Sequence, residues 1–238
     1  MKPLDRLRIE KAAADCGFEM TPLERDGCLE LRSARFAETL LVQPTGSSTL
    51  TVSASSAGLL DSVDGADIVT VDDFGALYDV LRTAAAHART LPNRVADAFR
   101  RETAGMPRST EAERVVVQRV GQNLFRSALL DYWQGRCCVT GLAVPELLRA
   151  SHIKPWAACD SDDERLDVFN GLLLTPHLDA LFDAGLMSVG DDGHVQLSSQ
   201  LSADTLERLG IGSPLDISGL QAAHQRYLGH HRSHVWRP

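Results

Sequence analysis

The sequence lacks the features that mark several common classes of protein. Its five cysteines (16, 28, 137, 138 and 159) form no even set and no repeated C-x-x-C, which argues against a disulfide framework and a four-thiolate zinc site. No apolar run approaches the roughly 18 residues that a membrane span needs, and the opening "MKPLDRLRIEKAAADCGF" lacks the apolar centre of a signal peptide. We therefore expect reduced thiols, no membrane association and a cytoplasmic location.

Positive charge is also scarce. The 24 Lys and Arg residues face 32 Asp and Glu residues, and the resulting net charge of -8 argues against a chain that coats nucleic acid. Residues 94–136 are the exception, because they hold eight arginines, no lysine and only five acidic residues. This segment is the one place where a phosphate backbone would bind favourably without a metal.

The first 93 residues predict a small mixed domain. Residues 5–15 have a helical pattern, and the β-prone runs "CLELRS", "ETLLVQP" and "TLTVSAS" follow, separated by turn residues. Residues 73–91 return to a helical period, with Leu77, Leu81 and Ala85 four residues apart. The pattern predicts an α-β-β-β-α domain whose role is left open between DNA recognition and interaction with proteins.

Residues 94–136 predict a basic helical connector, and residues 137–238 a second domain. Thr110 and Glu113 form a T-x-x-E capping box that begins a long helix ending near Trp133. From Cys137 the pattern changes to short alternating turns and strands, followed by helices. The whole chain therefore belongs to the α+β class.

Several polar residues of the segment 151–183 could act together. Asp179 and Asp183 are four residues apart, so on a helix both carboxylates lie on one face and repel each other. A divalent cation would relieve that repulsion, and hard oxygen ligands suit Mg²⁺ or Mn²⁺. Each residue also has a purely structural alternative: a solvated helix face for this pair, a core hydrogen bond for His152, a turn for Asn170 and a helix end for His177.

Taken together, the motifs resemble a known family. "RCCVTG", "SHIKPW", "NGLLL" and "LDALFDAG" occur in the order and at the spacing of the HNH endonuclease family, in the restriction-type subgroup that reads S-H-I-x-P-W, N-G-L-x-L and L-D-x-x-F-D-x-G. The resemblance covers about residues 109–236 and leaves the first 90 or so outside. It implies a ββα-metal fold, with two strands around the "SHI" and "NGL" motifs and a helix that carries metal ligands.

The same resemblance implies the roles of individual residues. His152 matches the general base, and Asn170 matches the central asparagine, which holds the loop and orients the base. The expected reaction is metal-dependent hydrolysis of DNA, leaving a 5′ phosphate and a 3′ hydroxyl. We expect Arg126, Arg149 and Lys154 to contact the nucleic acid.

The expected metal ligands depart from the family pattern at two points. Asp179 stands where the family has its second histidine, with Asp183 a further ligand one turn later and His177 a substitute two residues earlier. Ser151 stands where many relatives have a metal-binding Asp or His immediately before the base. The resemblance thus implies a site for Mg²⁺ or Mn²⁺ with weaker ligands than usual.

Two functions from different classes follow. The first is an HNH endonuclease that cleaves DNA, in the restriction of foreign DNA. The alternative is a catalytically inactive module that keeps the fold and binds nucleic acid or protein, supported by Ser151 and the missing second histidine. A homodimer is compatible with either function.

Overall fold

The structure is a computed structural model that describes residues 1–46, 49–56, 58–60, 67–91, 94–212, 214–217 and 219–238. It divides the chain into two compact units, Met1–Arg89 and Thr90–Pro238, here called the first and the second unit. Both contain helices and strands, as expected for the α+β class. The domain boundary expected after residue 93 falls beside residues 92–93, which lie outside the described residues.

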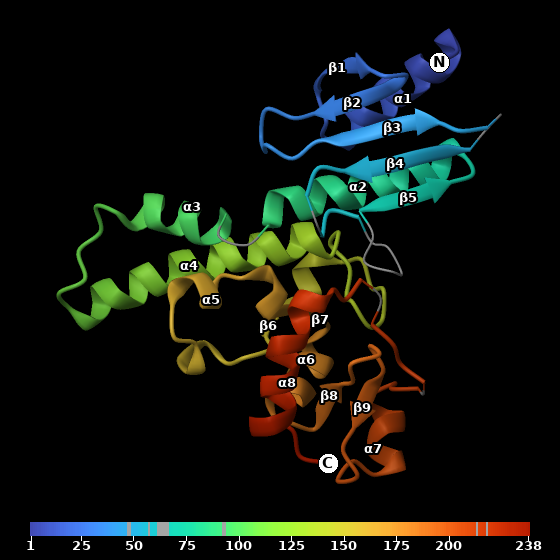
Figure 1. Ribbon diagram of the computed structural model, residues 1–238. Coiled ribbons are helices and arrows are strands. Elements are labelled where there is room, and N and C mark those ends of the chain that lie inside the picture. Colours follow the sequence, from blue (N-terminus) through green and yellow to red (C-terminus); the bar gives the residue numbers. More distant parts are fainter. Residues whose placement is uncertain (47–48, 57, 61–66, 92–93, 213, 218) are drawn as a thin grey trace. The chain divides into compact units, whose positions relative to one another are not determined.

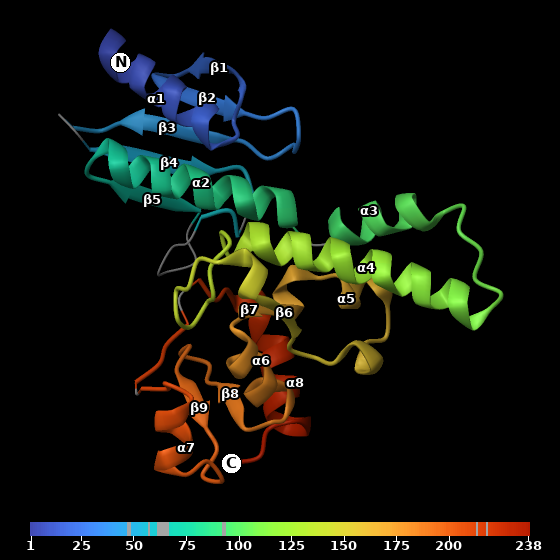
Figure 2. The ribbon, with the colours of Figure 1, turned by 180° about the vertical axis from the view of Figure 1, so that it is seen from behind.

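The first unit is a five-stranded antiparallel sheet, with its strands in chain order and two helices on one face (Figure 2). Inward side chains such as Leu29, Val42 and Val52 alternate with more exposed ones and pack beneath the helices, where Leu77 and Leu81 are fully buried. The elements are α1 (Pro3–Cys16), β1 (Met20–Arg25), β2 (Cys28–Arg32), β3 (Leu40–Pro44), β4 (Leu50–Ala54), β5 (Ile68–Val71) and α2 (Phe74–Thr90).

The prediction of three strands was wrong, because β1 and β5 were missed. Both are edge strands with one neighbour each. Five of the six residues of β1 are exposed, and in β5 only Val71 is buried. An edge strand that buries little has no regular apolar alternation for the sequence to reveal.

The second unit contains two small hairpins and several helices (Figure 1). The strands β6 and β7 form one antiparallel pair, and β8 and β9 form the other. The elements are α3 (Arg94–Thr103), α4 (Glu111–Tyr132), η1 (Pro145–Leu147), β6 (Arg149–His152), η2 (Trp156–Ala158), α5 (Asp162–Arg165), η3 (Val168–Asn170), β7 (Gly171–Leu174), α6 (Pro176–Asp183), β8 (Met187–Val189), β9 (Val195–Leu197), α7 (Ala203–Arg208), η4 (Ala222–His224) and α8 (Gln225–His234).

Helix α4 begins where the sequence predicts and is part of the second unit's core. The Thr110 hydroxyl accepts from the Glu113 amide at 3.2 Å, and the Glu113 carboxylate accepts from the Thr110 amide at 2.9 Å, which is the expected capping box. Phe125 and Leu129 are buried in one core with the strand β7. The segment 94–136 is therefore not a separate connector, because α4 shares its apolar face with the hairpin and α3 packs beside α4.

The C-terminal helix α8 is fixed to the same core by a buried histidine. His231 stacks on Phe182 with ring centroids 3.9 Å apart, and its Nδ1 lies 3.1 Å from the Ser188 hydroxyl. None of the described helices has both the length and the apolar character of a membrane span.

Candidate active site

The hairpin formed by β6 and β7 brings the two expected chemical residues together. His152 ends β6 and pairs with Gly171, which directly follows Asn170. Helix α4 approaches so closely here that a Cβ on Gly171 would lie 2.7 Å from side-chain carbons of both Phe125 and Leu129. Only glycine leaves room for this approach. The hairpin thus holds His152 against α4.

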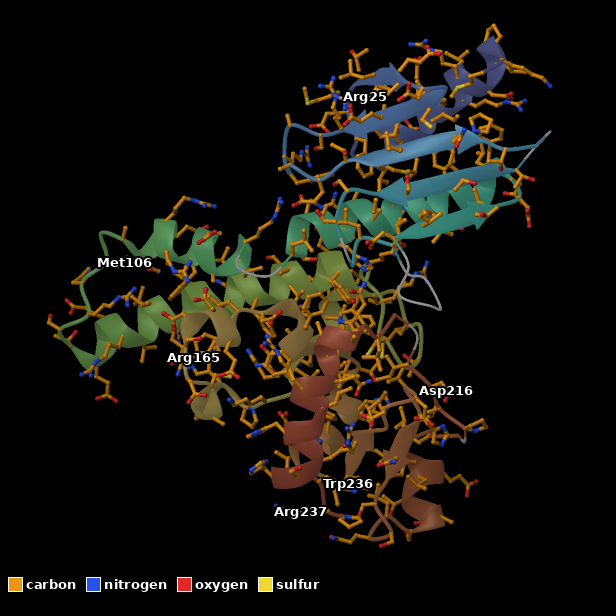
Figure 3. The ribbon with its side chains drawn as sticks, viewed as in Figure 1. Arg25, Met106, Arg165, Asp216, Trp236 and Arg237 are labelled. Carbon is orange, nitrogen blue, oxygen red and sulfur yellow. The ribbon has the colours of Figure 1, made fainter. Side chains whose placement is uncertain are left out.

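Three neighbours fix the imidazole ring of His152. Its Nε2 lies 2.8 Å from the carbonyl oxygen of Arg165, which is labelled at the end of α5 in Figure 3. One face of the ring stacks on Phe125 with centroids 3.9 Å apart, and Trp156 makes an edge contact at 5.5 Å. Because a carbonyl oxygen only accepts, Nε2 carries the hydrogen, and Nδ1 of the neutral ring keeps its lone pair.

The surroundings of His152 favour the neutral imidazole. Burial lowers the pKa of His152 below its ordinary value, and the hydrogen bond to the Arg165 carbonyl only partly opposes this shift. A histidine that is neutral at neutral pH, with one ring nitrogen unprotonated, is the form that a general base requires. This arrangement can accept a proton at Nδ1.

Asn170 fastens the loop that supplies the Arg165 carbonyl. Its side chain is completely buried, and its Oδ1 accepts from the Lys154 amide at 2.7 Å. Its Nδ2 donates toward the carbonyl oxygens of Lys154 and Glu164, each at 3.2 Å. The two ends of the loop 154–164 are thereby tied to one side chain. Asn170 is therefore linked to His152 through the loop that supplies the Arg165 carbonyl.

An open cleft of about 440 Å³ borders His152. It lies between α4 and β6, and its lining includes the aromatic neighbours of the base. The lining residues are Gln122, Asn123, Phe125, Arg126, Arg149, Ala150, His152 and Trp156. A ligand in this cleft would lie beside the imidazole.

The three side chains that are expected to contact nucleic acid differ in whether they already have partners within the protein. Arg126 donates to the carbonyl oxygens of Pro145 and Leu148, both at 2.7 Å, so this guanidinium holds the turn before β6. Lys154 is only 13% exposed and pairs with Glu164 at 2.8 Å. Arg149 is exposed and lines the cleft, and its side chain has no hydrogen bond or ion pair within the described part of the chain. Arg149 is therefore the expected contact that remains available to a ligand.

Helix α6 brings together the two carboxylates that the sequence predicts to be paired. Partial burial and the charge of Asp179 raise the pKa of Asp183 above its ordinary value. No hydrogen bond or ion pair to another described residue satisfies either carboxylate. Two close carboxylates without a cation repel each other, and Mg²⁺ is commonly held by one or two carboxylates with water and substrate phosphate as the other ligands. The pair therefore fits a hard divalent cation as a partial ligand set.

The expected ligand His177 does not complete a metal-binding group with this pair. Among the described residues, no three His, Cys, Asp or Glu side chains form a group that could hold a metal ion. His177 is half-buried in the first turn of α6, beside Pro176. The Ser151 hydroxyl is buried and has no hydrogen-bond partner among the described residues. Within the same residues, no hydrogen bond or ring contact links His152 to the α6 carboxylates.

Sequence reasoning missed several of the residues that surround His152. The stacking partner Phe125 could have been suggested by its four-residue spacing from Gly121 and Leu129. The carbonyl of Arg165 had no signal, because any residue supplies a backbone acceptor. Gln122 and Asn123 also had none, since exposed amides are common on helix surfaces.

Comparison with known families agrees with this geometry. Residues 137–190 match the family model described as HNH endonuclease. The matched segment contains the hairpin with His152 and Asn170 and the helix with both carboxylates. A search of curated proteins found no match. The match supports the predicted family for this part of the chain, while the subgroup and the individual residue roles stay predictions.

Proposed function

We propose that the second unit is an HNH endonuclease that hydrolyses phosphodiester bonds of DNA with the help of Mg²⁺ or Mn²⁺. The observation that carries the proposal is the His152 imidazole, whose Nε2 is bonded to a carbonyl and whose ring borders a cleft that contains Arg149. The matched segment 137–190 includes this histidine. A base beside a cationic cleft is suited to attack on an anionic phosphodiester.

In the proposed reaction, His152 takes a proton from water at Nδ1 while the water oxygen bonds to phosphorus. The bond between phosphorus and the 3′ oxygen breaks, and the leaving oxygen takes a proton from solvent, which gives a 5′ phosphate and a 3′ hydroxyl. Asn170 keeps the loop in place, and Arg149 binds a phosphate oxygen.

A divalent cation held by Asp179 and Asp183, with His177 and Ser151 as the other proposed ligands, would stabilise negative charge that grows on the phosphate oxygens. The proposal extends to restriction of foreign DNA, a cytoplasmic location and a homodimer. These three parts rest on the resemblance to the restriction-type subgroup of the HNH family. The first unit would then serve recognition or interaction.

One observation favours an inactive binding module as the second candidate. The described residues contain no complete three-ligand metal group, and Ser151 is a weak ligand. Such a module would bind DNA through the cleft without cutting it.

A plasmid-nicking assay separates the two candidates. The full chain and the variant His152→Ala are incubated with supercoiled plasmid in Mg²⁺, Mn²⁺ or EDTA. We expect metal-dependent nicking that falls by about 10²- to 10⁴-fold in the variant, because a general base contributes that much. Equal cleavage by both proteins would refute the role of His152. Binding without any cleavage would favour the inactive module.

A further inference from the structure

The α4 wall of the cleft carries two amide side chains that the proposed mechanism does not use. Gln122 and Asn123 are exposed, line the cleft and have no side-chain hydrogen bond within the described residues. Each amide offers two N–H donors and one carbonyl acceptor. They lie in the same cleft as Arg149, which comes from β6. The cleft therefore has polar groups available on both of its walls.

The positive charge of the residues that line the cleft favours an anionic ligand. No Asp or Glu is among the described residues that line the cleft, although acidic residues outnumber basic ones in the whole chain. Arg126 and Arg149 make the lining cationic, and the two amides add neutral donors. Anionic oxygens that accept several hydrogen bonds are the ligand chemistry that these groups share, and a DNA phosphate is such a group.

The packing of α4 fixes the backbone position of Gln122 and Asn123. The residue before them, Gly121, is buried, and a Cβ there would lie 3.1 Å from the Trp156 ring and 3.4 Å from the Phe99 ring. Glycine thus allows this turn of α4 to press against Trp156, whose edge also contacts His152. The backbone of Gln122 and Asn123 is consequently held by packing against Trp156, which also contacts His152.

We propose that Gln122 and Asn123 are substrate-binding residues that, with Arg149, hold a backbone phosphate of duplex DNA in the cleft beside His152. This inference rests on the proposed function and deepens it. It makes α4 one wall of the site, so the residues that bind substrate extend beyond the segment that matches the family.

Binding of a fluorescein-labelled DNA duplex by the full chain tests the inference. The measurements are made on His152→Ala, to prevent cleavage, with Gln122→Ala, Asn123→Ala or Arg149→Ala added. Gln118→Ala is the matched control, since Gln118 is exposed one turn earlier on α4 and does not line the cleft. We expect each amide variant to weaken binding by about 10-fold, as for a lost hydrogen bond to a charged group. The control should bind like the parent.

The salt dependence of binding distinguishes an amide contact from a change in the electrostatic field. Arg149→Ala should reduce the slope of log K against log salt by about 1, because one fewer counterion is released. The amide variants should lower affinity and leave that slope unchanged. In the active protein they should raise KM more than they lower kcat.

Two outcomes would overturn the inference, and they can be told apart. If Gln122→Ala and Asn123→Ala match Gln118→Ala in affinity and KM while the unsubstituted protein binds and cleaves DNA, the amides are ordinary surface residues and the proposed function stands. If the unsubstituted protein neither binds nor cleaves DNA, the proposed function fails and the inference fails with it.

Discussion

The surroundings of His152 and the carboxylates of α6 differ in how many of their polar groups find partners within the protein. Around His152, the ring stacks on Phe125, Nε2 is bonded to a carbonyl, and Asn170 closes the supporting loop. On α6, the carboxylates of Asp179 and Asp183 interact electrostatically, and neither has a hydrogen-bond partner among the described residues. The first arrangement is complete in the protein alone, whereas the second leaves two carboxylates whose repulsion a cation would relieve. We therefore expect folding alone to position His152, and the proposed cation to complete the acidic side.

Apart from removal of His152 itself, the largest expected effect comes from removing charge on α6. Asp179→Asn or Asp183→Asn should lower cleavage by on the order of 10²-fold or more, because a bound cation contributes several kcal/mol to the transition state. Neither change should lower the free energy of unfolding, since each relieves repulsion. Cleavage rates, Mn²⁺ binding by calorimetry and urea unfolding measure the three quantities. The exposed Glu207→Gln on α7 is the control. Unchanged Mn²⁺ affinity would move the metal site elsewhere, with His177 the first residue to test.

On the base side, the Asn170→Ala variant should affect both activity and stability. It leaves the amide of Lys154 and two carbonyl oxygens without their buried partner, which costs about 1–3 kcal/mol. The loop would also hold the Arg165 carbonyl less firmly against His152, so kcat should fall while KM changes little. Urea unfolding and steady-state kinetics measure the two effects. A variant with lowered stability but unchanged kcat would show that Asn170 only supports the fold.

Gly171→Ala tests the packing of α4 on the hairpin. The added methyl group would lie 2.7 Å from side chains of Phe125 and Leu129, so we expect a loss of about 1–3 kcal/mol in the free energy of unfolding. Gly229→Ala on α8 is the matched control, because no atom lies within 4 Å of its new Cβ and alanine favours a helix by about 1 kcal/mol. Equal effects of the two changes would contradict the close packing.

The smallest effect concerns pH. Because burial lowers the pKa of His152, the base stays neutral to lower pH, and the acid limb of kcat/KM should have its midpoint below the ordinary histidine value of about 6.5. The folded state then binds fewer protons than the unfolded chain, so the free energy of unfolding should fall as pH drops below about 6.5. Phe125→Ala, which uncovers the ring, should move the midpoint back toward that value. A midpoint above 6.5 in the unsubstituted protein would contradict the burial.

Local signals predicted the elements that bury a regular face or carry a cap. The capping box of α4 and the spacing of Asp179 and Asp183 could be predicted from the sequence, because each depends on neighbours within a few residues. The pairing of β6 with β7 joins segments that are far apart in the sequence, and it was expected only from the resemblance to the HNH family. The edge strands β1 and β5 could not be predicted, since they bury too little to leave a pattern. The expected connector at 94–136 also separated α4 from the unit to which it belongs. Amino-acid composition shows where the charge changes along the chain, but it gives no information about which faces pack together.

The acceptor that orients His152 belongs to the peptide backbone, and this has a consequence for sequence variation. Any amino acid at position 165 presents the same carbonyl, so substitution there leaves the acceptor chemically unchanged. The number of residues between Lys154 and Arg165 is constrained instead, because Asn170 ties the loop near both ends. The Arg165 guanidinium also donates to the carbonyl oxygens of Trp156 and Cys159, so it helps to hold the same loop. Related proteins should accordingly tolerate exchanges at other positions of this loop more readily than a deletion or insertion of one residue.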